Sequence, residues 1–323
     1  MGIPPIMDPR FGLTLSSEEH PPARLVDLAI GAEEAGFDFV SVSDHYHPWL
    51  SSQGHSPFVW SVLGAVAQAT STLEVGVGVS CPIVRMHPAV YAHAVATTAS
   101  LLEGRLTWGV GTGEALNEHV TGAEWPTAEV RLEMLEEAIL VIRRLWSEES
   151  VTHRGEHFIV EDARLFDRPE EAPPIVVSAF GPEAARVAAR AGDGLWITGL
   201  PDEIVDTYRK AGGEGAIWTQ LTLCWDPSRE AAIERAHRVW ANTALPGQLA
   251  QDLRTVKDLE DAVTLVTPEK IENEIPCGPD TDQIISSIKE AVAGGADYVY
   301  LHQIGDPLEG FIDVWRNEIE PAL

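Results

Sequence analysis

The stretch "EEAGFDFV", residues 33–40, decides the fold, because its pattern returns twice later in the chain. "ARAGDGLW" covers residues 189–196, and "AGGADYVY" covers residues 293–300. In each copy a glycine follows a helical pattern and comes just before a β-rich run, where a left-handed glycine would end the helix. Three copies of one helix-to-strand joint indicate a chain built from repeating β/α units.

The rest of the chain fits such a repeat, since β-rich runs alternate with helical patterns. Eight runs are candidate strands, most of them nearly continuous in apolar residues, as expected of parallel strands covered on both faces. They are residues 11–15, 37–43, 73–80, 105–112, 174–179, 195–199, 216–225 and 297–305. Helical patterns occur at residues 23–35, 88–102, 127–147, 182–191 and 281–293. This order predicts an α/β protein with a (β/α)8 TIM barrel. An open doubly wound sheet is the alternative, but it would need a dinucleotide fingerprint near the first strand, and none is there.

Two segments interrupt the repeat. Residues 150–172 predict a hairpin, and residues 241–280 separate the seventh strand from the last helix. Long insertions in barrels usually carry function, so we expect both of them at the C-terminal face of the strands. No linker or low-complexity run divides the chain, and we predict that residues 1–323 form a single domain.

Composition excludes several classes of function. The net charge of −28 comes from 50 acidic and 22 basic residues, and such a surface repels nucleic acid and anionic lipid. No apolar run is long enough for a membrane span. The three cysteines are scattered, and "MGIPPIMDPRFGL" lacks the features of a secretion signal, so we expect a cytoplasmic protein. Only four basic residues are lysine, which favours a salt-rich cytoplasm; a merely acidic protein is the alternative.

Active sites of barrels lie where the strands end, and the second strand ends in "SDHYHPW", residues 43–49. Asp44 stands beside His45, and a neighbouring carboxylate would orient the imidazole of His45 as a general base. A satisfied loop histidine is the alternative. His45 and His47 also form the H-x-H pair of metal-dependent hydrolases on barrels. Those enzymes need further histidines on later strands, which are missing here, so we predict no metal.

A glycine-rich stretch, "GVGTGEALNE", follows the fourth strand at residues 109–118. It does not match G-x-G-x-x-G from Gly109 or from Gly111, because Glu114 and Leu116 stand where glycine is required. We interpret the glycines as letting the backbone pass close to a flat ligand, with Glu114 pointing at it. The alternative is that Glu114 only caps the next helix.

A phosphate group is better placed after the fifth strand, at "SAFGPEAA", residues 178–185. Pro182 begins a helix there, and the free N–H groups of a helix start attract anions. An ordinary strand-to-helix turn would look the same.

Taken together, these residues are similar to a known family. "SVSDHYHPW", "QGHSPF", "RMHPAVYAHAVAT", "GVGTGEALNE", "AEWP" and "RAGDGLWIT" resemble the deazaflavin-dependent branch of the luciferase-like oxidoreductases. The nearest likeness is to the F420-dependent glucose-6-phosphate dehydrogenase family. It runs from about residue 10 to residue 212 and returns weakly at residues 280–320.

The resemblance implies a TIM-barrel dehydrogenase that uses coenzyme F420 to move hydride between a hydroxyl or carbonyl substrate and carbon C5 of the deazaflavin. His45 would take the hydroxyl proton, Glu114 would protonate N1, and Trp49 would pack against the substrate. A non-proline cis peptide would lie at Gly78–Val79. The implied cofactor-binding residues are Asp44, Gly78, Val79, Thr112, Gly113, Asn117, Ser178, Ala179, Phe180 and Gly181. An FMN-dependent monooxygenase on the same fold is the alternative.

One departure from the family concerns the substrate. The glucose-6-phosphate enzymes grip the sugar phosphate with two lysines and an arginine from the later insertions. The matching stretches here offer Asp261 or no basic residue, unless Lys257 or Arg254 substitutes. We therefore expect a neutral sugar or secondary alcohol, held near Trp49, Trp218 and His302, rather than a phosphosugar. A small-molecule substrate and a homodimer complete the expected partners, with no nucleic acid and no membrane.

The acidic composition predicts a dependence on salt. With 50 acidic residues and four lysines, self-repulsion in dilute buffer is large and is screened by added salt. We expect folding and activity to rise as potassium chloride approaches molar concentrations, which unfolding curves and turnover measured along a salt series would reveal. Full stability in low-salt buffer would remove the inference of a salt-rich cytoplasm without touching the assigned chemistry.

Overall fold

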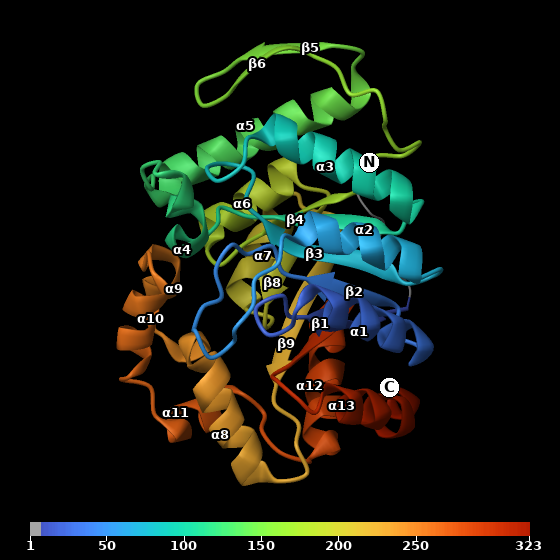
Figure 1. The fold of residues 1–323 in the computed structure, drawn as a ribbon, viewed down its shortest axis with the longest axis vertical. Helices are drawn as coiled ribbons and strands as arrows, with labels where there is room; N and C mark the ends of the chain where they lie inside the picture. Colours follow the sequence, from blue (N-terminus) through green and yellow to red (C-terminus); the bar gives the residue numbers. More distant parts are fainter. Residues whose placement is uncertain (1–7) are drawn as a thin grey trace.

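A computed structural model describes residues 8–323 and contains a closed barrel of eight parallel strands (Figure 1). All eight predicted runs are strands of this barrel, and the TIM-barrel prediction is confirmed. The strands are β1 (Arg10–Leu15), β2 (Phe39–Val42), β3 (Glu74–Ser80), β4 (Leu106–Val110), β7 (Ile175–Ser178), β8 (Gly194–Thr198), β9 (Ala216–Leu223) and β10 (Tyr298–Gln303). Each pairs with its neighbour in chain order, and β1 closes the ring by pairing with both β2 and β10.

Helices cover the outside of the barrel. They are α1 (Pro22–Glu34), α2 (Val59–Ala69), α3 (Pro88–Leu102), α4 (Ala115–Glu118), η1 (His119–Thr121), α5 (Ala128–Ser147), α6 (Pro182–Ala191), α7 (Asp202–Lys210), α12 (Thr281–Ala293), α13 (Leu308–Val314), η3 (Trp315–Ile319) and η4 (Glu320–Ala322). Within the described range no helix combines the length and apolar character that crossing a membrane would need. The expectation about the N-terminal segment falls mostly on residues 1–7, outside the described range.

The repeated helix-to-strand joint is built as predicted in two copies but not in the third. Gly36 and Gly295 have φ angles of 85° and 98°, the left-handed conformation that ends a helix. Gly192 instead has φ −90° and ψ 166°, so the left-handed prediction is wrong there. A Cβ at Gly192 would lie 2.9 Å from the Ala188 carbonyl oxygen, and it is this lack of space that requires glycine.

The same joint carries an aspartate with a shared structural role. Asp38, Asp193 and Asp297 each precede or begin a strand, and each side chain accepts a hydrogen bond from a backbone N–H at or near the start of an adjoining strand. The donors are Phe11, Ile175 and Ile217, and each bond is 2.8 Å long. These bonds tie neighbouring strands together at the end of the barrel where the strands begin.

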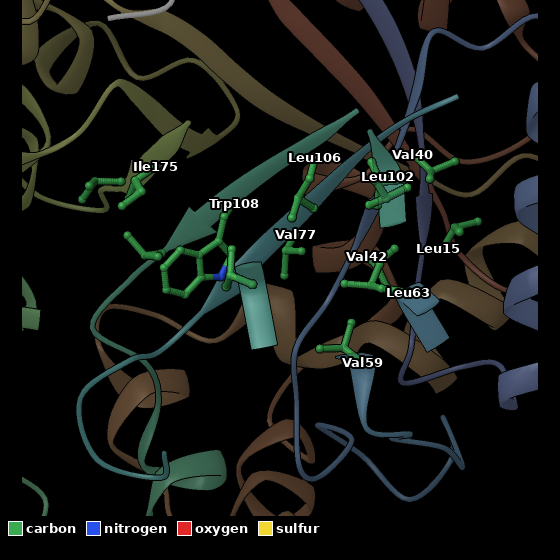
Figure 2. Close-up of a cluster of buried hydrophobic side chains, with 14 of the residues drawn as sticks. Leu15, Val40, Val42, Val59, Leu63, Val77, Leu102, Leu106, Trp108 and Ile175 are labelled. Carbon is green, nitrogen blue, oxygen red and sulfur yellow. The ribbon is translucent and has the colours of Figure 1, made fainter. Parts of the chain in front are cut away.

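Two apolar layers stabilise the barrel. The outer layer lies between strands and helices, and Figure 2 shows part of it, with Val42, Val77 and Leu106 from the strands near Val59 and Leu63 of α2. The inner layer fills the barrel itself and is largely aromatic. Its members are Phe39, Val176, Trp196, Ala216, Trp218, Tyr298 and Tyr300. Because these rings close one end of the barrel, a cavity can form only at the other end.

The two insertions lie on different sides of the molecule. Residues 150–172 form the predicted hairpin, β5 (Val151–Arg154) and β6 (Ile159–Ala163), but it connects α5 to the start of β7. It therefore belongs to the end where strands begin, and our placement of it at the C-terminal face is wrong. Residues 241–280 do follow a strand, and with α8 (Arg229–Trp240) they form η2 (Ala241–Ala244), α9 (Leu249–Asp252), α10 (Val256–Val263) and α11 (Pro268–Glu274). In Figure 1 the hairpin and this helical segment lie at opposite ends.

Because the aromatic layer fills the barrel, we expect that no side chain larger than hydrogen fits at Gly12 on β1 without strain. A Cβ at Gly12 on β1 would lie 2.5–2.7 Å from three ring atoms of Phe39. We expect Gly12→Ala to lower the free energy of unfolding by about 1–3 kcal/mol, the usual cost of overpacking. Gly64→Ala is the matched control, since Gly64 lies inside α2 with open space around it, and alanine there should stabilise the helix by up to about 1 kcal/mol. Equal stability of both variants in urea unfolding would contradict this account of the barrel interior.

Candidate active site

A cavity of about 730 Å³ opens at the ends of the strands, between the barrel and the 241–280 segment. Seven predicted site residues line it: His45, Trp49, Gly78, Val79, Glu114, Ser178 and Phe180. They come from the ends of β2, β3, β4 and β7, which a parallel barrel brings to one face. The sequence therefore predicted a set of residues that lie together in space.

His45 is paired with a carboxylate, but not with the predicted one. Its Nδ1 atom lies 3.0 Å from Oε1 of Glu18, an ion-pair distance, although the ring is turned too far for a well-aligned hydrogen bond. Asp44, the chain neighbour, points away from His45. Its Oδ1 accepts from Arg85 Nη2 at 2.8 Å and its Oδ2 from Ser80 Oγ at 2.7 Å. Our assignment of Asp44 as the carboxylate that orients His45 is therefore wrong.

Glu18 is held in a form suited to this pairing. It accepts hydrogen bonds from Ser43 Oγ at 2.7 Å and from Ser16 Oγ at 2.9 Å. Burial acts to raise the pKa of Glu18, but His45, Ser43 and Ser16 oppose it and hold the pKa below its usual range. Glu18 thus stays ionised near neutral pH and places a negative charge beside the His45 ring.

Glu18 was not among the predicted site residues, because the prediction did not include the residues that follow the first strand. "SSEEH", residues 16–20, follows β1 directly, so its side chains could have been placed at the same face as the ends of β2 and β4. Trp196, Trp240 and Asn242 also line the cavity and were not predicted. Trp218 was expected near the substrate but lies fully buried in the aromatic layer, off the cavity wall.

Trp49 and Glu114 complete the two walls beside His45. The Trp49 ring meets the His45 ring edge-on, with centroids 5.1 Å apart, so the indole limits how far the imidazole can turn. Glu114 is the N-cap residue of α4, although its side chain makes no capping hydrogen bond, and its Oε2 is 3.4 Å from Asn117 Nδ2. Asn117 itself is buried, and its Oδ1 accepts from the backbone N–H groups of Tyr46 and His47. Asn117 therefore connects the loop that carries His45 to the turn that carries Glu114.

The glycines of residues 109–113 make room for protein rather than directly for a ligand. A Cβ at Gly109 would collide with the Val77 carbonyl oxygen, and one at Gly111 would lie 3.1 Å from Val79. Gly113 has φ 70°, and a Cβ there would lie 2.5 Å from Cys81 Sγ. The predicted cis peptide between Gly78 and Val79 is confirmed, and Val79 projects into the space that these glycines leave. The side of the cavity where the sequence analysis expected a flat ligand is thus built by β3 packed on β4.

The remaining predicted binding residues lie around the cavity without lining it. Ala179 is buried, and Gly181 is the residue before α6, which begins with Pro182 and has no side-chain cap. The N–H groups of this helix start have no intrahelical partner and suit an anionic group next to Ser178 and Phe180. Asp44, Thr112, Gly113 and Asn117 stand behind the wall. Their assignment to the cofactor stays a prediction.

The two histidines of the H-x-H motif diverge. His47 directs Nδ1 to the Leu116 carbonyl oxygen at 3.0 Å, whereas His45 faces Glu18. Across the described chain no three histidine, cysteine, aspartate or glutamate side chains gather as a metal site would need. The motif therefore serves two separate contacts.

Comparison with known families and structures gives consistent results. The model of the family described as luciferase-like monooxygenase matches residues 6–298. The F420-dependent glucose-6-phosphate dehydrogenase of Segniliparus rotundus is 35% identical, over 97% of this chain and 98% of that protein. The enzyme of the same name from Microbacterium testaceum is 34% identical, over 97% of each chain.

Solved structures place the chain in the same group. An F420-dependent secondary alcohol dehydrogenase in complex with an F420–acetone adduct superposes with a TM-score of 0.90 at 31% identity, covering 98% of this chain and 99% of that one. The F420-dependent tetrahydromethanopterin reductase of Methanopyrus kandleri has a TM-score of 0.78 at 21% identity, covering 97% and 99%, and shares the fold.

The buried carboxyl of Glu118 should make the free energy of unfolding depend on pH. Burial raises the pKa of Glu118 to about 7, with Arg85 opposing and Glu114 adding to the rise. A carboxyl with a raised pKa stabilises the fold below its unfolded pKa, and this stability is lost as pH rises toward 7. Glu118→Gln should therefore reduce the fall in unfolding free energy between pH 5 and pH 8 by about 2–3 kcal/mol.

Urea unfolding of both proteins at the two pH values measures this difference. Glu156→Gln, at an exposed carboxyl of the hairpin, is the control and should leave the pH dependence as in the wild type. An unchanged pH dependence in Glu118→Gln would show that the buried carboxyl is ionised throughout.

Proposed function

Because the chain belongs to the luciferase-like monooxygenase family, and its F420-dependent relatives match it almost end to end, we propose that it is an F420-dependent dehydrogenase acting on a hydroxyl or carbonyl group. The observation that carries this proposal is the cavity itself, which holds a histidine–carboxylate pair and a second carboxylate, Glu114. An FMN-dependent monooxygenase is the weaker alternative, since three monooxygenase structures with this fold are 14%, 16% and 20% identical to this chain, whereas the F420-dependent secondary alcohol dehydrogenase is 31% identical.

The residues present fit a deazaflavin. Gly78 has no space for a side chain on its inner side, where Trp196 and Ser41 lie, so the Gly78–Val79 edge offers a flat wall for a ring. Ser178, Phe180 and the start of α6 suit the phosphate-bearing side chain. Thr112, Gly113, Ala179 and Gly181 would contribute backbone groups, while Asp44 and Asn117 would act by holding the loops. When bound, coenzyme F420 supplies the carbon that accepts or donates hydride.

The chain's own residues would move and hold the protons. His45 takes the proton of the substrate hydroxyl, and ionised Glu18 stabilises the resulting imidazolium. Trp49 packs beside His45 and excludes water from that side. Glu114 lines the cavity on the wall formed by the end of β4 and would protonate N1 of the deazaflavin.

The cavity favours an uncharged substrate. No lysine or arginine of the described chain lines it, whereas Glu18, Glu114 and Glu274 do. Lys257, one candidate phosphate ligand, is exposed and paired with Asp261, and Arg254 lies on the surface. Each charge-assisted hydrogen bond to a phosphate is worth roughly 1.5–3 kcal/mol, so losing two or three of them removes most of the affinity for a sugar phosphate. A neutral sugar or secondary alcohol is the better substrate.

We further propose that residues 1–323 act as one domain, as a homodimer in a salt-rich cytoplasm, without nucleic-acid or membrane partners. The net charge of −28 supports the salt-rich setting. Exposed apolar side chains support the homodimer: Val90 and Leu101 on α3, and Leu140 on α5, a helix that packs against α3.

Cofactor binding and turnover test the proposal together. The protein should bind coenzyme F420 at micromolar concentration or better and FMN far more weakly, and absorbance of the oxidised deazaflavin should fall when a suitable alcohol is added. His45→Ala should lower kcat by roughly 10²–10⁴, the usual range for a general base, with F420 affinity almost unchanged. His47→Ala is the matched control in the same loop and should keep turnover within a few fold. Equal affinity for FMN, or full turnover by His45→Ala, would refute the assignment.

A further inference from the structure

Two consecutive carboxylates each face a histidine. Glu18 pairs with His45 after β2, and Glu19 lies beside His302 on β10, with 3.6 Å between Glu19 Oε1 and His302 Nε2. The arrangement follows from the barrel order, because β1 pairs with β2 on one side and with β10 on the other. Residues directly after β1 therefore lie between the two histidines. The first pair serves the reacting hydroxyl in the proposed function, and the second is left without a role.

The second pair is braced by the end of α8. Trp240, the last residue of α8, donates its Nε1–H to Glu19 Oε1 at 2.6 Å. The Trp240 ring also meets the His302 ring edge-on, with centroids 4.5 Å apart. His302 Nδ1 is 3.5 Å from the side-chain nitrogen of Gln220, which leaves Nε2 as the ring atom that can donate. Both side chains of the pair are almost fully buried, at 2% exposure for His302 and 5% for Glu19.

Polar atoms around this pair lack partners. Within residues 8–323, His302 Nε2, Asn242 Oδ1 and Thr14 Oγ1 are buried and make no hydrogen bond. All three residues line the cavity. Buried polar groups in folded proteins are nearly always paired, so three unpaired groups on residues that line one cavity point to a ligand that supplies the missing bonds. The set contains a donor, an acceptor and a hydroxyl that can be either, which matches alcohol groups.

We propose that His302, Glu19 and Asn242 form a second subsite that binds a further hydroxyl of the substrate, so that the substrate class is a neutral polyol or sugar rather than a simple secondary alcohol. This inference rests on the proposed function for the position of the reacting hydroxyl at His45. The subsite does not suit a phosphate, because its acidic member is Glu19 and no lysine or arginine among residues 8–323 lines the cavity. His302 and Asn242 are specificity-determining residues, and Glu19 positions His302.

A subsite of this kind discriminates against substrates that lack the second hydroxyl, because they leave its polar groups without hydrogen-bond partners. A substrate with one hydroxyl at His45 leaves Asn242 and His302 buried without partners, and sites built to bind a hydroxyl reject analogues that lack it strongly. The wild type should therefore show kcat/KM at least tenfold higher for 2,3-butanediol or glucose than for 2-butanol, which has a single hydroxyl. Glucose should also exceed glucose 6-phosphate.

The experiment compares these substrates in the F420-loaded enzyme and in variants. His302→Ala and Asn242→Ala should lower kcat/KM for the favoured polyol by ten- to a hundredfold, mainly through KM, and change 2-butanol less than threefold. His302→Gln keeps an N–H donor and should recover part of the loss. His93→Ala, at an exposed histidine of α3, is the control, and thermal unfolding of every variant separates misfolding from lost binding. A wild type that turns over 2-butanol as well as the polyols, or variants that lose both equally, would overturn the subsite.

A binding measurement without the cofactor separates the two proposals. Saturation-transfer NMR on the protein alone should detect the favoured polyol with the wild type and lose that signal with His302→Ala. If this holds while no alcohol is oxidised, the subsite stands and the proposed dehydrogenase activity fails. If alcohols are oxidised but the polyol signal does not depend on His302, the activity stands and the subsite fails.

Discussion

Stacked aromatic rings inside the barrel determine at which end of the barrel a cavity can form. Trp196 and Trp218 stack with centroids 4.8 Å apart, and Trp218 stacks on Tyr298 at 3.8 Å. Trp196 also donates its indole N–H to the hydroxyl of Tyr300, which satisfies the polar tip of a buried ring. Because the rings occupy the strand-start half of the barrel, the strand-end half stays open, and Trp196 and Tyr300 become its floor. Glycines on β1 and β3 leave the space that these rings occupy.

The ring of strands also decides which side chains can cooperate. A residue that follows β1 is a neighbour in space of residues that follow β2 and β10, although hundreds of positions separate the last two. Glu18 and Glu19 exploit this position in opposite directions. Trp240, the last residue of α8, then closes the second direction by bonding Glu19, and residues of the 241–280 segment such as Asn242 line the cavity next to it.

Sequence reasoning was strongest where a pattern depends on burial alone. The eight strands are nearly continuous apolar runs, and helices such as residues 88–102 and 182–191 were placed at their observed ends. It failed where proximity in the chain was taken for proximity in space: Asp44 adjoins His45 in sequence but binds Arg85, and Glu18 is 27 positions away. The hairpin was assigned to the wrong end because the side of a barrel depends on whether a segment precedes or follows a strand. Gly192 shows that glycine can be required for two different reasons: a left-handed φ, as at Gly36 and Gly295, or a lack of space for a Cβ atom.

The aspartates at the helix-to-strand joints divide the acidic residues of this protein into two populations. Asp38, Asp193 and Asp297 accept backbone N–H groups, as does Glu33, which receives three of them from residues 71–73 and whose pKa falls to about 2. Burial opposes that fall in pKa and is outweighed by these hydrogen bonds. Such carboxylates are structural acceptors that no dissolved ion replaces. To adapt the protein to dilute buffer, only the carboxylates that accept no backbone hydrogen bond should be exchanged for neutral or basic side chains. The total number of acidic residues therefore overstates how far the negative charge can be lowered before the hydrogen bonds between strands are lost.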